Sequence, residues 1–180
     1  DVFDNAFPRF KGYLPQGEIL EIGSGGGRDA VKIKRAGFGY VGMDISSGLL
    51  EEAKKSHPNI KFIPGNIYNP PNFGISFDGF WCAATLIHIP KARVGEALTN
   101  INQITRDGGV GFIALKEGEG DMVLEKGELD GQIFERYTTY YWVSEFFRIL
   151  ERNRFSVIDA YPLPVSQKTT WLNFFVETHK

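Results

Sequence analysis

The chain of 180 residues is poor in the side chains that hold metals and form disulfides: it has one cysteine, Cys82, and three histidines, His57, His88 and His179. A single thiol cannot close an internal disulfide or build a cysteine-rich zinc centre, so we predict no metal site and a reducing, cytoplasmic setting. No apolar run approaches the ~20 residues that cross a bilayer, and no basic-then-apolar leader is visible, so we expect no membrane partner.

An excess of charge of one sign is also lacking. Twenty Lys and Arg residues stand against 22 Asp and Glu residues, which gives a net charge of −2. A protein held to nucleic acid mainly by phosphate contacts needs a basic face, so this balance argues against nucleic acid as a partner. The composition is otherwise ordinary, with 42% hydrophobic and 23% charged residues. Together with the length, it predicts one domain over residues 1–180.

Strand-like and helix-like segments alternate through most of the chain. Apolar runs occur at 18–22, 40–43, 60–63, 77–83 and 110–115, with helical patterns at 28–36, 47–56 and 91–105. This alternation predicts a parallel sheet with helices on both faces. After a helix at 143–153, the runs 155–161 and 172–177 are joined by a loop at 162–170 that has no room for a helix, so they must be antiparallel neighbours. We therefore predict a doubly wound α/β sheet of seven strands, mostly parallel, with one reversed strand near the edge.

The segment 116–140 fits neither pattern. It is rich in glycine and acids, and it follows the carboxyl end of the fifth predicted strand, where open α/β sheets bind ligands. Long loops in compact domains are commonly lids or binding loops, so we predict a lid loop at 116–140. Phe3, Phe7 and Phe10 near the start of the chain are interpreted as the remnant of a cover over the same site.

A glycine-rich turn follows the first predicted strand. Glycine stands at positions 23, 25 and 27, directly before a predicted helix, and the acid Glu21 precedes the turn. Glycine lets the backbone turn sharply and lets a ligand lie against it. A second acid, Asp44, ends the next strand 21 residues after Gly23. A carboxylate there can accept both hydroxyls of an adenosine ribose, but many nucleoside-binding folds share this device.

Glu21, the alternating glycines and Asp44 together resemble the class I S-adenosylmethionine-dependent methyltransferases. The resemblance covers about residues 15–178, and later segments extend it: Gly65-Asn66-Ile67, Phe77-Asp78-Gly79-Phe80-Trp81, Leu86-Ile87-His88-Ile89-Pro90 and Asp107-Gly108-Gly109. The chain departs from the family at Asn66, where Asp is usual, and at Asp107, where Pro is usual. An Asn carbonyl oxygen can still accept from an exocyclic amine. The resemblance implies a Rossmann-like fold, S-adenosylmethionine as cofactor and methyl transfer as the activity.

The resemblance also implies which residues contact the cofactor. The candidates are Glu21, Gly23, Ser24, Gly25, Gly27, Arg28, Asp44, Ile45, Asn66, Ile67, Ala83 and Ala84. His88 follows the fourth strand and is a candidate general base, because imidazole titrates near neutral pH. The alternative is a structural histidine that is hydrogen-bonded at the start of the next helix.

Three residues are candidates for contact with the methyl acceptor. Lys116 ends the fifth strand, and Arg136 and Tyr140 belong to an aromatic cluster in which Arg136 could hold an anion. The alternatives are a solvated loop for Lys116 and an amphipathic helix entry for the other two. The Asn-Pro-Pro motif at 69–73 resembles the site of methyltransferases that act on amino groups of bases and glutamine. It precedes the fourth strand instead of ending it, so we interpret it as a rigid turn.

We predict methyl transfer to a small molecule, since neither a basic stripe nor an additional domain is visible and the segment 116–140 could enclose a compact acceptor. Methylation of RNA or protein is an alternative, as is a protein that binds the cofactor without transferring a methyl group. A nicotinamide-dependent oxidoreductase is a third alternative. It is disfavoured by Glu21, by Arg28 in place of a third glycine, and by the terminal strand pair. The acceptor and the oligomeric state are not predicted.

Overall fold

The computed structural model describes residues 2–129 and 132–180. Helices and strands alternate along the chain, as the sequence predicts. The elements are α1 (Val2–Tyr13), β1 (Glu18–Ile22), α2 (Ala30–Arg35), β2 (Gly39–Asp44), α3 (Ser47–Ser56), β3 (Phe62–Pro64), β4 (Phe77–Ala83), the short 3-10 helix η1 (Leu86–His88), α4 (Lys91–Ile104), β5 (Thr105–Glu117), β6 (Val123–Leu129), β7 (Gln132–Thr138), β8 (Tyr140–Tyr141), α5 (Val143–Arg152), β9 (Phe155–Ser166) and β10 (Thr169–Thr178).

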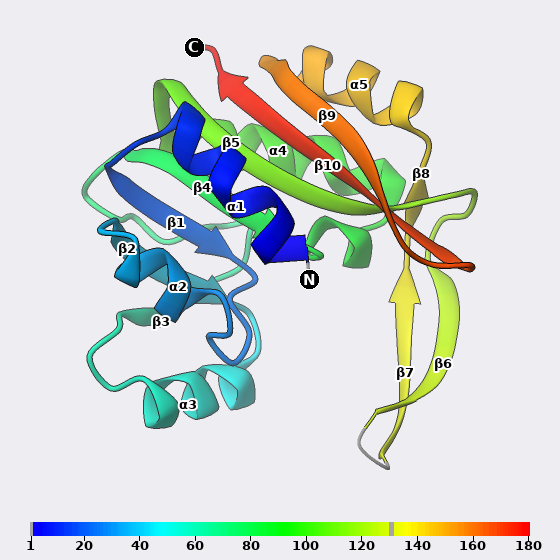
Figure 1. The fold of residues 1–180 in the computed structure, drawn as a ribbon, viewed down its shortest axis with the longest axis horizontal. Helices are drawn as coiled ribbons and strands as arrows, with labels where there is room; N and C mark the ends of the chain where they lie inside the picture. Colours follow the sequence, from blue (N-terminus) through cyan, green and yellow to red (C-terminus); the bar gives the residue numbers. More distant parts are fainter. Residues whose placement is uncertain (1, 130–131) are drawn as a thin grey trace.

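One twisted sheet forms the centre of the molecule (Figure 1). Its strands follow the order β3-β2-β1-β4-β5-β10-β9, and the two-residue β8 adds to the end of β5. All neighbours are parallel except β10, which runs antiparallel to both β5 and β9. The prediction of a mostly parallel seven-stranded sheet with one reversed strand near the edge is confirmed. Chain order reverses at β1, between β2 and β4, and this switch point is where such sheets bind ligands.

The two faces of the sheet carry separate hydrophobic cores. Successive strand residues point to opposite faces, so Ile19 and Trp81 belong to one core while their neighbours Leu20 and Cys82 belong to the other. Helices α1, α2 and α3 cover the first face, and α4 and α5 cover the second (Figure 1). Cys82 is a buried strand thiol, and its burial raises its pKa to about 12.

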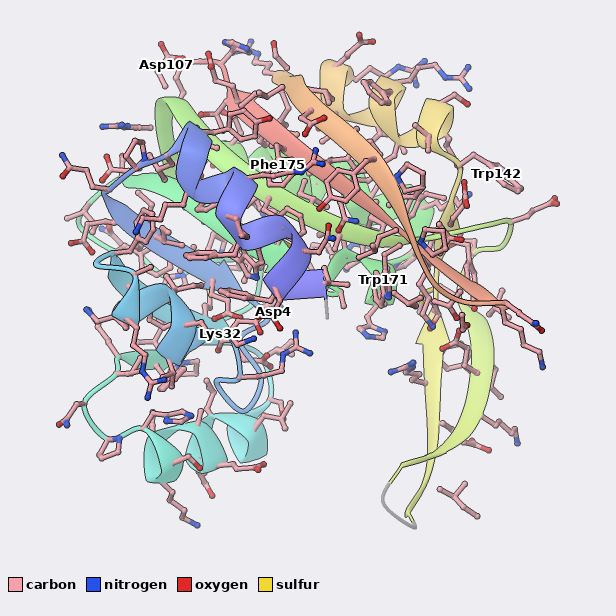
Figure 2. All side chains as sticks on the ribbon, viewed as in Figure 1. Asp4, Lys32, Asp107, Trp142, Trp171 and Phe175 are labelled. Carbon is pink, nitrogen blue, oxygen red and sulfur yellow. The ribbon has the colours of Figure 1, made fainter. Side chains whose placement is uncertain are left out.

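Helix α1 is part of the core, which corrects the interpretation of its phenylalanines as a cover over the site. Phe3, Phe7 and Phe10 are buried, and all three pack on the indole of Trp81 with ring centroids 5.1–5.7 Å away. The helix is also held from outside, because Asp4 and Lys32 of α2 form an ion pair of 2.6 Å (Figure 2).

The segment 116–140 is not the loop that we predicted. Strands β6 and β7 form an antiparallel hairpin that extends beyond the main sheet, next to β8 (Figure 1). Apolar and charged residues come there in adjacent pairs, as in Val123-Leu124-Glu125-Lys126, so the sequence lacks the strict alternation that marks an exposed strand. The loop predicted at 162–170 is also shorter, since β9 and β10 continue to within two residues of each other. Among the described helices, none combines the length and apolar character needed to cross a membrane.

Candidate active site

A cavity of about 410 Å³ opens where the carboxyl ends of β1, β2 and β4 meet. Backbone and side chains from the loops after these strands form its wall. The lining residues are Ile22, Gly23, Gly25, Met43, Asp44, Ile45, Leu49, Gly65, Asn66, Ile67, Tyr68, Ala83, Ala84, Thr85, His88 and Ile89. The wall is mainly apolar with a few polar groups that converge on it, which is the usual character of a small-molecule site.

The glycine loop adopts a backbone that only glycine takes without strain. Gly23 and Gly25 have φ values of +75° and +52°. A Cβ added at Gly23 would overlap the hydroxyl of Thr85, which itself donates to the carbonyl of Ile22 at 2.8 Å. A Cβ at Gly25 would meet no atom nearer than 4.0 Å, because the space beside it is the cavity. Gly23 is therefore required for packing, and Gly25 leaves room for a ligand.

Asp44 joins the glycine loop to the start of α3. One carboxylate oxygen accepts from the amide of Gly25 and the other from the amide of Ser46, both at 2.8 Å. Ser46 in turn caps α3 by accepting from the Leu49 amide. Each carboxylate oxygen keeps a free lone pair, so Asp44 can accept two further hydrogen bonds from a ligand in the cavity.

Asn66 and Ile67 line the far end of the cavity after β3. The Asn66 side-chain oxygen accepts from the Tyr68 amide at 3.0 Å, and one lone pair of that oxygen remains for a ligand. Asn66 also forms an isolated bridge with Asn69, so the turn spans residues 66–69, and residues 70–73 of the Asn-Pro-Pro motif follow it as irregular chain before β4. The motif therefore precedes β4 as the sequence analysis places it, but the turn lies just before it and not over residues 69–73.

Ala84 lines the cavity directly after β4 with a φ of +60°, a conformation that costs a residue with a Cβ about 1–2 kcal/mol. Its amide donates to the Ala114 carbonyl of β5 at 3.1 Å, so the sheet holds the strained residue in place. Backbone strain of this kind gathers at functional sites. Ala83 and Thr85 line the cavity on either side.

His88 lies in η1 at the cavity wall and is exposed. Its Nδ1 lies 2.8 Å from the carbonyl oxygen of Tyr137 in β7. His88 is thus both at the cavity, as the base hypothesis requires, and hydrogen-bonded, as the structural alternative requires.

Four of the predicted cofactor residues do not line the cavity. Glu21 is buried behind the glycine loop and accepts a hydrogen bond from the Tyr40 hydroxyl. Burial raises its pKa to about 8, against the opposing effect of that hydrogen bond. Ser24 is buried with its hydroxyl unpaired among the described residues, and Gly27 packs against Phe62.

The fourth of these residues, Arg28, lies outside the cavity with a largely exposed side chain. It pairs with the buried carboxylate of Asp29 at 2.7 Å. The second oxygen of Asp29 accepts from the indole Nε1 of Trp81. This arrangement fixes the start of α2 instead of presenting Arg28 to a ligand in the cavity.

The three predicted acceptor residues come together around one carboxylate, that of Glu125 in β6. Lys116 donates to it at 2.7 and 2.9 Å, Arg136 donates at 3.0 Å, and the Tyr140 hydroxyl donates to it as well. Burial opposes ionisation, but hydrogen bonds from these groups outweigh burial and lower the pKa of Glu125 to about 2. Glu125 was not predicted, because nothing in the sequence distinguishes it from the many other acids of this segment. Contact of the three residues with an acceptor stays a prediction.

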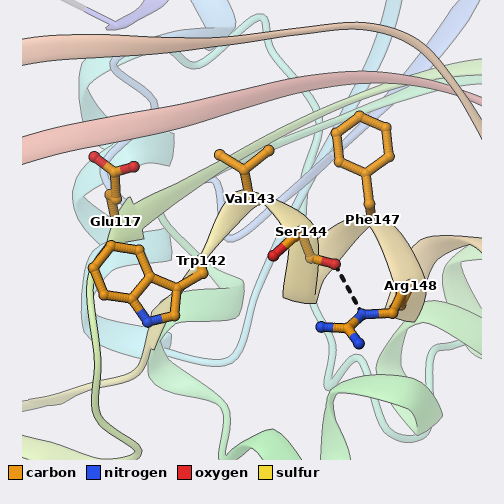
Figure 3. A pocket seen from close by; sticks show the side chains of 6 residues that line it. All are labelled: Glu117, Trp142, Val143, Ser144, Phe147 and Arg148. Atoms are coloured by element: carbon orange, nitrogen blue, oxygen red, sulfur yellow. Dashed lines mark hydrogen bonds between the residues drawn. The ribbon is translucent and has the colours of Figure 1, made fainter.

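A second hollow, of about 750 Å³, lies between the end of β5 and the start of α5 (Figure 3). Figure 3 shows Glu117 beside the indole of Trp142, and Arg148 donating to the Ser144 carbonyl at 3.1 Å. This hollow contains none of the strand-end residues that line the 410 Å³ cavity. We therefore place the candidate active site in the cavity at the switch point.

A family model described as a methyltransferase domain matches residues 19–109, just over half of the chain. The chain belongs to this methyltransferase-domain family. The matched residues run from β1 into β5 and include every loop that lines the cavity.

This methyltransferase domain is also similar to curated proteins. It is 29% identical to a demethylmenaquinone methyltransferase of Renibacterium salmoninarum over 54% of this chain and 40% of that protein. It is 27% identical to the O-methyltransferase rstn1 of Aspergillus nomiae over 78% of this chain and 65% of that protein. The chain thus spans less than two thirds of the length of either relative.

Solved structures agree with the fold. A methyltransferase from Methanosarcina mazei superposes with a TM-score of 0.83 at 16% identity, over 96% of this chain and 97% of that one. The 1,6-didemethyltoxoflavin-N1-methyltransferase of Burkholderia thailandensis, solved with bound 1,6-didemethyltoxoflavin and S-adenosylhomocysteine, superposes with a TM-score of 0.81 at 18% identity, over 99% of this chain and 79% of that one. At these identities the likeness establishes the fold, which is that of the class I methyltransferases.

Proposed function

We propose that this protein transfers a methyl group from S-adenosylmethionine to a small-molecule acceptor. The observation that carries the proposal is the cavity formed by the glycine loop and Asp44. Gly25 leaves room for a ligand against the backbone, and Asp44 is oriented by two amides with lone pairs to spare. These features fit a nucleoside that carries a polar tail.

Different residues of the cavity would bind different parts of the cofactor. Asp44 would accept the ribose hydroxyls, and Asn66 with Ile67 would receive the adenine. The backbone around Gly23 and Gly25 would hold the methionine end, and Glu21 would support the loop from behind. The cofactor supplies an activated methyl group as a sulfonium. The protein then has to align the acceptor, exclude water and take up the acceptor's proton where that is needed.

His88 is the group that we propose as the proton acceptor, because it lines the cavity next to Ala84 and Thr85. A small acceptor agrees with the cavity volume and with relatives named for menaquinone precursors and toxoflavin precursors. We expect His88→Ala to abolish turnover while affinity for S-adenosylhomocysteine is kept. Near-normal turnover would contradict the role of a base.

The cofactor assignment is tested by calorimetric titration with S-adenosylhomocysteine and, separately, with NADH. The wild type should bind S-adenosylhomocysteine with micromolar affinity and NADH not at all. Asp44→Ala should weaken binding at least ~100-fold, because hydrogen bonds to a charged acceptor contribute about 1.5–3 kcal/mol each.

Asp107→Ala is the matched control, because Asp107 lies in β5 outside the cavity lining and pairs with the Lys180 amide (Figure 2). This variant should bind like the wild type. Failure of the wild type to bind S-adenosylhomocysteine, or full binding by Asp44→Ala, would overturn the assignment.

A further inference from the structure

One edge of the β6–β7 hairpin contacts η1, which carries the candidate base His88. Strand β7 pairs with β6 along one edge. From its other edge, the Thr139 amide just after β7 donates to the Ile87 carbonyl at 2.7 Å, and the Tyr137 carbonyl meets His88 Nδ1 at 2.8 Å. These two contacts join the hairpin to η1 at the wall of the cavity.

The contact at His88 fixes where the ring carries its proton. A carbonyl oxygen can only accept a hydrogen bond, so Nδ1 must be the protonated nitrogen. A neutral imidazole then has a bare Nε2. Among the described residues, no protein group is hydrogen-bonded to Nε2. The contact therefore selects one of the two neutral forms of His88, a residue of the cavity wall, and leaves Nε2 without a protein partner among the described residues.

We infer that the Tyr137 carbonyl is a positioning group which holds His88 as the Nδ1–H tautomer, and that Glu125 is the positioning residue which keeps this carbonyl in place. The inference rests on the proposed function of His88 as a base. The proton of an acceptor hydroxyl or amine passes to Nε2, and the ring becomes a cation that still donates from Nδ1 to Tyr137. A ring with its proton on Nε2 could not accept at that atom.

Glu125 is suited to this role because it ties three elements together. Its carboxylate, in β6, receives Lys116 from the end of the central strand β5, Arg136 from β7 and Tyr140 from β8. Lys116 is only 8% exposed, so its charge needs this carboxylate as a partner. Arg136 immediately precedes Tyr137, so the same cluster sets the position of the carbonyl that meets His88.

The tautomer can be read directly by ¹⁵N NMR of histidine-labelled protein at a pH where the rings are neutral. The three histidines give few signals, and loss of one set in His88→Gln assigns His88. In the wild type we expect the Nε2 signal of His88 in the range of an unprotonated ring nitrogen. In Glu125→Gln we expect the Nδ1–H fraction to fall at least twofold.

Glu135→Gln is the matched control. Glu135 lies on the same hairpin and pairs with Lys126 at 2.5 Å, but both side chains are more than half exposed, and neither belongs to the Glu125 cluster. This variant should leave the tautomer unchanged. Should Glu125→Gln fold poorly, Lys116→Met tests the same link without leaving a buried positive charge, and the same fall is expected.

A His88 ring with its proton on Nε2 in the wild type would overturn the inference. So would an unchanged tautomer in folded Glu125→Gln or Lys116→Met, or an equal change in Glu135→Gln. Binding of S-adenosylhomocysteine, measured on the same samples, distinguishes failure of the tautomer inference from failure of the proposed function. If the wild type does not bind S-adenosylhomocysteine, the proposed methyltransferase function is wrong. The tautomer of His88 in the wild type and the variants decides the inference about Tyr137 and Glu125.

Discussion

The buried carboxyl of Glu21 is predicted to make the folded protein less stable as the pH rises. Glu21 lies behind the glycine loop, and burial raises its pKa from 4.5 to about 8 despite the hydrogen bond from Tyr40. Below pH 4.5 the carboxyl is protonated in both the folded and the unfolded state. Between 4.5 and 8 only the folded state keeps the proton, so unfolding releases it. Above 8 both states are ionised and the penalty stays constant.

The size of the effect follows from the width of this pH window. Each pH unit inside it lowers the free energy of unfolding by about 1.4 kcal/mol. At pH 7, 2.5 units above the unfolded value of 4.5, the penalty is about 3 kcal/mol. Glu21→Gln removes the titration, while its amide oxygen can still accept from the Tyr40 hydroxyl. The variant should therefore be more stable than the wild type at neutral pH, by about 3 kcal/mol.

The assay is urea denaturation of both proteins at pH 5, 6, 7 and 8, with Glu51→Gln on the exposed side of α3 as control. The stability difference between Glu21→Gln and wild type should grow by about 1.4 kcal/mol per pH unit and level off near pH 8. The difference for Glu51→Gln should stay flat. A pH-independent difference for Glu21→Gln would refute the reasoning, because it would mean that Glu21 titrates equally in both states.

Three further outcomes test the site. Gly25→Ala should lower the free energy of unfolding by about 1–2 kcal/mol, since its φ is positive but its surroundings are open, and it should abolish S-adenosylhomocysteine binding in calorimetry. Gly23→Ala should lower the free energy of unfolding by more, because its Cβ would overlap Thr85. Ala84→Gly should raise the free energy of unfolding by up to about 1 kcal/mol, and a lower value than in the wild type would contradict strain at φ +60°. Glu125, with a pKa lowered to about 2, stabilises the protein above pH 4.5 and loses this contribution as the pH falls towards 2. In urea denaturation, Glu125→Gln should be about 2–3 kcal/mol less stable than the wild type at pH 7, and this difference should shrink as the pH falls towards 2.

Local chemistry in the sequence was sufficient for the architecture and for the cofactor end of the cavity. The apolar runs and helical patterns predicted the order of strands and helices along the chain, because a central parallel strand buries both faces and a helix buries one. Gly23, Gly25 and Asp44 were predictable for a similar reason. A positive φ and a carboxylate at a strand end are local requirements, and they leave a local signature.

Contacts between residues far apart in the sequence became visible only in the tertiary structure. Glu21 and Arg28 belong to the right motif, but their surroundings, Tyr40 and Asp29, turn them away from the cavity. The hairpin at 123–138 brings Glu125 to Lys116 and the Tyr137 carbonyl to His88 across 49 residues of sequence. Nothing in the sequence around His88 marks its partner, because a backbone carbonyl is present at every residue and only the fold selects which one it meets.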